Sequence, residues 1–317
     1  MKVIKKMFKI IGIILLILFL LIVVLLVIGA YKSNQPLVAK DYSSKVETGG
    51  EIEAKYLANG AYDSIKTKEI KTDKSYGKFV IYYPEKLEEK ERFPVVIISN
   101  GSGTKVTRIS ESVKHLCTWG FVVIGTLEQS DWAGTSANDC LELLIKLNEN
   151  KNINEWDNQP LYQKLDLENI GILGHSQGGV GCINAVTTTE KGSMIKTIVA
   201  ESPTNMELAE KLNWHYDPSK VNVPTLLLAG TGKAETEIVV NEEQLKAIYN
   251  TLPDSIEKVM ARRTGADHDR TNQDMDGYVT AWFMWELQGD EEAAGAFIGN
   301  KSELQNNPLY QNFQKNE

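Results

Sequence analysis

The stretch Asn169-Ile170-Gly171-Ile172-Leu173-Gly174-His175-Ser176-Gln177-Gly178-Gly179 decides the fold. An apolar run with the composition of a short buried strand ends in Gly-x-Ser-x-Gly, and a segment able to form a helix, 180–186, follows at once. This order is typical of a nucleophile elbow, the sharp turn that presents a catalytic serine. Such a turn strains the serine backbone and leaves no room for side chains two residues before and after it. Glycine is therefore expected at both positions, and Gly174 and Gly178 stand there. The sequence therefore predicts Ser176 as a nucleophile.

Strand and helix signals alternate on both sides of this turn. Apolar runs that predict buried strands lie at 78–84, 93–99, 120–125, 195–200, 224–229 and 257–261. Segments with helical spacing of apolar residues lie between these strands at 106–119 and 138–147, and after the last strand at 278–287. Near-continuous apolar strands separated by helices predict an α/β fold, with a mostly parallel central sheet and helices on both faces.

A serine nucleophile needs a base within hydrogen-bond reach, and the chain contains four histidines. His175 adjoins the nucleophile and cannot turn back onto it. His115 precedes the elbow in the chain, and His215 lies in a polar connection. His268 follows the last predicted strand, where the base belongs when the chain order is serine, acid, histidine. We therefore predict His268 as the base.

Three carboxylates are candidates for the acid that orients the base. Glu235 is the first choice and Glu237 the second, because both lie in the loop after the predicted strand 224–229. Glu201, which follows an earlier strand, is the third. Asp267 and Asp269 flank His268 too closely to orient its ring. The sequence leaves the choice among the three glutamates open.

An oxyanion formed in such a reaction needs two preorganised N–H groups. The amide of Gln177 is one candidate, since it begins the predicted helix. The amide of Ser102 is the other, in the turn Asn100-Gly101-Ser102-Gly103 after a predicted strand. No Gly-rich phosphate loop and no metal-ligand spacing occur in the sequence, so neither a cofactor nor a metal is predicted.

The N-terminus predicts a membrane anchor. The run from Ile10 to Ala30 carries no charge and reaches the ~20 residues that a helix needs to cross a bilayer. Lysines at 2, 5, 6 and 9 predict a cytoplasmic N-terminus and an extracytoplasmic C-terminal part. A signal peptide cleaved near Ala30, giving a secreted protein, is the alternative. The length of the apolar run favours the uncleaved anchor.

We expect four segments: a lysine-rich tip and transmembrane anchor at 1–31, a polar stalk at 32–60, a catalytic domain at 61–300 and a polar C-terminal tail at 301–317. The chain has 34 basic and 42 acidic residues, and residues 1–31 contain four lysines and no acid. The rest therefore carries 30 basic and 42 acidic residues, a formal charge of −12, which disfavours nucleic acid as a partner. Three cysteines without a Cys/His cluster predict neither a disulfide framework nor a zinc site. We expect the catalytic domain to be monomeric.

Several of these motifs together resemble α/β-hydrolases of the dienelactone hydrolase, chlorophyllase and polyester-hydrolase (cutinase-like) group. The resemblance covers roughly residues 50–300. It rests on Tyr82-Tyr83-Pro84, Val95-Val96-Ile97-Ile98-Ser99-Asn100-Gly101, Gly120-Phe121-Val122-Val123, the Gly174–Gly179 elbow, Gly265-Ala266-Asp267-His268 and Trp282-Phe283-Met284-Trp285-Glu286-Leu287-Gln288-Gly289-Asp290.

The resemblance implies a serine carboxylesterase with Ser176, His268 and an acid near Glu235. Two positions depart from the pattern of the group. Its usual acid is Asp, whereas Glu235 stands here, displaced by about one residue. The group also often has His-Gly or Pro-Gly where this chain has Asn100-Gly101.

The sequence thus predicts a membrane-anchored extracytoplasmic hydrolase that cleaves carboxylic esters through an acyl-enzyme on Ser176. The alternative is a catalytically inactive hydrolase-fold protein that serves as a surface binding module. The connection 201–224 is too short for a large lid, which favours soluble or surface esters as substrates. Trp132 and Trp214 could form the walls of an acyl pocket.

Overall fold

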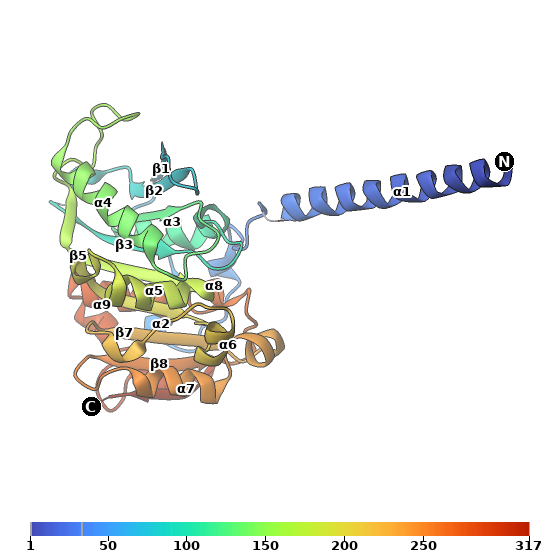
Figure 1. Cartoon of the computed structure of the whole chain (residues 1–317). Coiled ribbons are helices and arrows are strands. Elements are labelled where there is room, and N and C mark those ends of the chain that lie inside the picture. The colour runs from blue at the N-terminus through green and yellow to red at the C-terminus, as the bar shows by residue number, and fades with distance from the viewer. Residues whose placement is uncertain (1, 33, 90, 317) are drawn as a thin grey trace. The chain divides into compact units, whose positions relative to one another are not determined.

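The computed structural model describes residues 2–32, 34–89 and 91–316 (Figure 1). The chain divides into two units, Met1–Pro36 and Leu37–Glu317. In the first, α1 (Lys2–Lys32) contains the stretch Ile11–Gly29, which is long and apolar enough to be a candidate membrane span. The lysine side chains on which the predicted orientation rests lie outside the described residues.

One sheet forms the centre of the second unit, in the strand order β1-β2-β4-β3-β5-β6-β7-β8-β9 among the described residues. The strands from β3 to β8 run parallel, and β1, β2 and β9 pair antiparallel at the two edges. This confirms the predicted α/β class. The bounds are β1 (Ile65–Lys71), β2 (Lys78–Pro84), β3 (Phe93–Ser99), β4 (Val122–Thr126), β5 (Leu165–His175), β6 (Ile195–Glu201), β7 (Thr225–Gly230), β8 (Lys258–Arg263) and β9 (Tyr310–Lys315).

Helices cover both faces of the sheet because its central strands are apolar on both sides. In β3, Val95 and Ile97 pack with one core cluster, and Val96 and Ile98 pack with the other. The first cluster includes residues of α4, α5 and α7, and the second includes residues of α2, α3 and α9. Bounds are α2 (Glu51–Leu57), α3 (Ser110–Thr118), α4 (Thr135–Glu149), α5 (Gln177–Thr188), α6 (Met206–Lys211), α7 (Glu242–Thr251), α8 (Thr271–Asp274), α9 (Asp276–Gln288), α10 (Glu291–Ala294) and α11 (Glu303–Asn306).

The domain begins earlier and ends later than the sequence predicts. The segment expected to be a stalk packs into it from residue 37 onward, with Val38, Tyr42 and Tyr56 buried. The expected polar tail supplies α11 and the edge strand β9.

These two segments bind each other through buried hydrogen bonds between polar residues. In the sequence alone, such polar residues look solvent-exposed. The Glu53 carboxylate accepts hydrogen bonds from Asn307 Nδ2 at 2.8 Å and from the Tyr310 hydroxyl at 3.1 Å. The Glu303 carboxylate accepts from the amides of Ile52 and Glu53 at the start of α2.

Candidate active site

Ser176 stands at the sharp turn between β5 and α5, with φ 59° and ψ −120°. The space around the turn leaves no room for a side chain at either Gly174 or Gly178. A Cβ on Gly174 would lie 2.1 Å from the carbonyl oxygen of Gly178, and a Cβ on Gly178 would lie 2.0 Å from the carbonyl oxygen of Ser99. The elbow thus closes so tightly on its own backbone and on the end of β3 that no side chain fits beside the serine. Ser176 itself is half-buried.

A continuous chain of contacts joins Ser176 to a histidine and a carboxylate. The Ser176 hydroxyl lies 3.0 Å from His268 Nε2, and His268 Nδ1 lies 2.6 Å from Glu235 Oε2. His268 follows β8 and keeps a side chain 23% exposed, whereas Glu235 is fully buried. Because a carboxylate only accepts hydrogen bonds, Nδ1 carries the proton, and Nε2 is free to accept from the serine.

The structure distinguishes the three glutamates that the sequence leaves open. Glu235 opens a π-helical turn, Glu235–Val239, after β7, and its carboxylate contacts His268 Nδ1. Glu237 is exposed on the same turn. Glu201 is buried at the end of β6, where its Oε2 accepts from Asn272 Nδ2 at 2.6 Å. Burial raises the pKa of Glu201 to about 8, so this carboxyl holds its proton at neutral pH.

The other three histidines have different surroundings. The His175 ring lies against that of His268, tilted by 33° with ring centroids 4.5 Å apart, and its Nε2 lies 2.9 Å from the carbonyl oxygen of His268. Burial and the neighbouring His268 lower the pKa of His175 to about 3, so His175 is a neutral donor to the loop that carries His268. His115 is buried against Asp276, and His215 pairs with Glu210 at the surface.

The two predicted oxyanion donors lie on the segments that flank Ser176. Gln177 is the first residue of α5, where helix amides have no partner within the helix. Ser102 follows Gly101, whose added Cβ would lie 2.8 Å from the carbonyl oxygen of His175 and 3.6 Å from the Cβ of Ser176. The backbone around Gly101 therefore lies close against the elbow.

Asn100 has a role in this turn that sequence reasoning did not assign. Its side-chain amide donates to the carbonyl oxygens of Thr126 and Glu128, each at 2.9 Å. The amide of Gly103 donates to the carbonyl oxygen of Gln129 at 2.9 Å. These bonds tie the turn that carries Ser102 to the end of β4. The signal in the sequence is the residue type itself, Asn at a position where the resembled group often has His or Pro.

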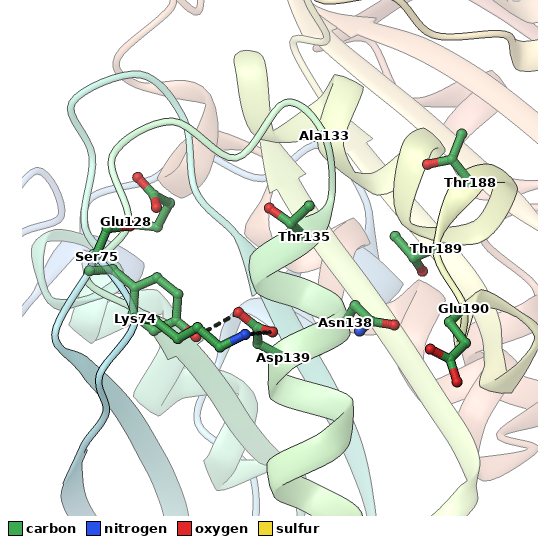
Figure 2. A pocket seen from close by; sticks show the side chains of 11 residues that line it. Lys74, Ser75, Glu128, Ala133, Thr135, Asn138, Asp139, Thr188, Thr189 and Glu190 are labelled. Atoms are coloured by element: carbon green, nitrogen blue, oxygen red, sulfur yellow. Dashed lines mark hydrogen bonds and ion pairs between the residues drawn. The ribbon is translucent and has the colours of Figure 1, made fainter.

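One groove in the domain lies away from Ser176. It has a volume of about 610 Å³ and runs between the turn at Lys74–Tyr76, the start of α4 and the end of α5 (Figure 2). Asp139, one of its lining residues, binds Lys74 Nζ and the Tyr76 hydroxyl, each at 2.9 Å. The triad residues do not line it. Trp132 and Trp214, the expected acyl-pocket walls, are both half-buried. Within the described residues no cluster of potential metal ligands occurs.

Comparison with known proteins places this geometry in context. The family model for PETase, described as PET hydrolase-like, matches residues 43–311. Cutinase 1 of Thermobifida cellulosilytica is 28% identical over 224 residues, covering 68% of this chain and 75% of that protein. Cutinase of Thermobifida fusca (strain YX) is 28% identical, with coverage of 68% and 65%. Bis(hydroxyethyl) terephthalate hydrolase of Streptomyces coelicolor is 24% identical over 226 residues, with coverage of 68% and 64%.

Proposed function

Because the chain belongs to the PET hydrolase-like family of α/β-hydrolases, we propose that it hydrolyses carboxylic esters through an acyl-enzyme on Ser176. His268 acts as the general base, and Glu235 orients it. The observation that carries the proposal is the unbroken line of contacts from the Ser176 hydroxyl through the imidazole to the buried Glu235 carboxylate. No second function has a comparable arrangement behind it.

The order of proton transfers follows from these contacts. His268 Nε2 takes the Ser176 proton as the oxygen attacks the ester carbonyl, and it later returns that proton to the departing alcohol. A water activated by the same imidazole then hydrolyses the acyl-enzyme. Glu235 holds Nδ1–H in place and stabilises the imidazolium that forms. Its complete burial strengthens this electrostatic effect.

The amides of Gln177 and Ser102 are the proposed donors to the oxyanion. Both belong to backbone fixed by close packing, the first at the start of α5 and the second beside Gly101. Donors that are already in place cost no reorganisation as charge develops on the oxygen. Neither a metal nor a cofactor is needed for these steps.

The proposed substrates are carboxylic esters that reach Ser176 from solvent, small or displayed on a surface. The connection between β6 and β7 contains only the short helix α6 and one turn at Pro218–Lys220. This is too little chain for a large lid. Similarity to proteins named cutinase and bis(hydroxyethyl) terephthalate hydrolase supports the same class of substrate.

We place the catalytic domain outside the cytoplasm, held by the candidate span Ile11–Gly29. Protease added to intact cells should then release the domain by cutting between residues 33 and 36. A domain cut only after lysis would contradict this orientation. A mature chain beginning near residue 31 would instead support cleavage of a signal peptide.

The proposal is tested by the hydrolysis of p-nitrophenyl butyrate by the wild-type chain and by Ser176→Ala. We expect the variant to keep its fold and lose turnover by several orders of magnitude. Turnover that persists in the variant would remove Ser176 from the mechanism. A wild-type chain that binds esters without cleaving them would favour the inactive binding protein.

A further inference from the structure

Asp267 precedes the proposed base, and its carboxylate bonds to the backbone of both the acid and the base. Its Oδ1 accepts a hydrogen bond from the amide of Glu235 at 2.9 Å and another from the amide of His268 at 3.0 Å. Glu235 and His268 follow different strands, β7 and β8, and are 33 positions apart in the chain. One oxygen atom therefore connects the two loops whose side chains meet at Nδ1.

The surrounding backbone leaves this carboxylate little freedom. The amide of Gly232, in the loop that leads to Glu235, donates to the carbonyl oxygen of Ala266 at 2.7 Å. A Cβ added to Gly232 would lie 2.6 to 2.7 Å from three atoms of Asp267. The loops are thus packed together at this point, and only glycine fits opposite the carboxylate.

The same contacts keep Asp267 ionised. The amides of Glu235 and His268 hold the pKa of its carboxyl below the usual value, because both donate to the charged form. Asp267 is only half-buried, so solvent weakens its electrostatic effect on neighbouring groups. Its clearest contribution is geometric, because a charged acceptor shared by two amides fixes their separation.

We propose that Asp267 is a positioning residue for the triad, which sets the contact between Glu235 and His268 by binding both of their backbone amides. The proposal rests on the function proposed above for Ser176, His268 and Glu235. Without the shared oxygen, both amides would lose this acceptor, and the two loops would no longer be joined through it. The 2.6 Å contact that holds the imidazole would then be free to lengthen.

Two substitutions separate the geometric role from the charge. Asp267→Asn keeps an oxygen at the same place and removes the charge, whereas Asp267→Ala removes the acceptor. Asp269→Ala is the matched control, because Asp269 is an exposed carboxylate on the other side of His268. All three are compared with wild type for kcat and KM on p-nitrophenyl butyrate across pH, and for thermal unfolding.

We expect Asp267→Ala to lower kcat by roughly 10- to 100-fold, the scale of a small misplacement of catalytic groups, with KM within about twofold. Asp267→Asn should keep kcat within about threefold. The acidic limb of the pH–rate profile of Asp267→Asn should move to lower pH. The substitution removes a nearby negative charge, and that charge favours the protonated imidazole. Asp269→Ala should match wild type in kcat.

A readout that needs no turnover separates this proposal from the proposed function. In Ser176→Ala, the proton between His268 Nδ1 and Glu235 should give a low-field proton NMR resonance. Adding Asp267→Ala should broaden or abolish that resonance, and adding Asp269→Ala should leave it in place. The proposal is overturned if the resonance survives Asp267→Ala unchanged. It is also overturned if kcat of a folded Asp267→Ala stays within twofold of wild type, or if Asp267→Asn is as damaging as Asp267→Ala.

Discussion

Replacing Glu235 by Gln should disable the enzyme while leaving it folded. The glutamate is fully buried, its Oε2 holds His268 Nδ1 at 2.6 Å, and its Oε1 has no hydrogen-bond partner within the described residues. A glutamine there has two orientations. If its oxygen faces Nδ1, a buried NH₂ is left unpaired. If its NH₂ faces Nδ1, the imidazole must carry its proton on Nε2, where it can no longer accept from Ser176.

Two estimates give the range of the expected decrease in kcat. Charges about 4 Å apart at an effective dielectric constant of about 20 attract by about 4 kcal/mol, so loss of the carboxylate charge alone corresponds to a decrease of about 10³ in kcat. The equivalent Asp→Asn change in a serine protease, which also imposes the wrong tautomer, lowers kcat by about 10⁴, or about 5.4 kcal/mol. We therefore expect Glu235→Gln to lower kcat by about 10³ to 10⁴, with KM nearly unchanged.

The assay is steady-state hydrolysis of p-nitrophenyl butyrate, with thermal unfolding to show that each variant is folded. Glu237→Gln and Glu201→Gln are the controls, because the first carboxylate is exposed and the second is bound by Asn272 rather than by His268. Both should stay near wild type in kcat. A Glu235→Gln enzyme within tenfold of wild type would refute the reasoning. Strong loss in Glu201→Gln instead would transfer the acid to the end of β6.

The remaining predictions concern the base, a buried carboxyl and the elbow. His268→Ala should cost about as much kcat as Ser176→Ala, and the double variant hardly more, since the two groups act in one step; additive losses in p-nitrophenyl butyrate turnover would argue against that. The pKa of Glu201 is about 8 in the folded protein against an ordinary 4.5, so the folded state retains this proton while the unfolded state loses it. Stability should accordingly fall as pH rises from about 4.5 to about 8. Glu201→Gln should remove that trend, so that at pH 8 its free energy of unfolding increases relative to wild type by on the order of a few kcal/mol. Denaturant unfolding of both proteins at pH 5 and pH 8 measures this difference, and parallel pH dependences would contradict the prediction. Gly178→Ala should lower Tm by roughly 5 °C or more and abolish activity, because its Cβ would press on the carbonyl oxygen of Ser99; calorimetry showing an unchanged Tm would count against the close packing of the elbow.

The centre of the fold is readable from the sequence because its signals are local. The apolar runs that become β3, β5 and β7, and the Gly-x-Ser-x-Gly turn between β5 and α5, are each a short contiguous stretch of the chain. His268 could be selected by its place after the last parallel strand. These inferences need only residue type and chain order.

What the sequence does not reveal depends on contacts between distant segments. The choice of Glu235 over Glu237 depends on the π-helical turn that points one side chain inward and leaves the other exposed. The packing of the first segment of the domain depends on Glu53, which looks solvated until Asn307 and Tyr310 bind it from the far end of the chain. Neither arrangement leaves a periodic pattern.

The central claim is that Ser176 carries the acyl group during turnover. Intact-protein mass spectrometry of the wild-type chain, quenched in acid during hydrolysis of p-nitrophenyl butyrate, tests it most directly, followed by peptide mapping. The account predicts a butyryl adduct on the peptide that contains Ser176, absent in Ser176→Ala and accumulating more slowly in His268→Ala. An adduct on another residue, or rapid turnover in Ser176→Ala, would contradict it.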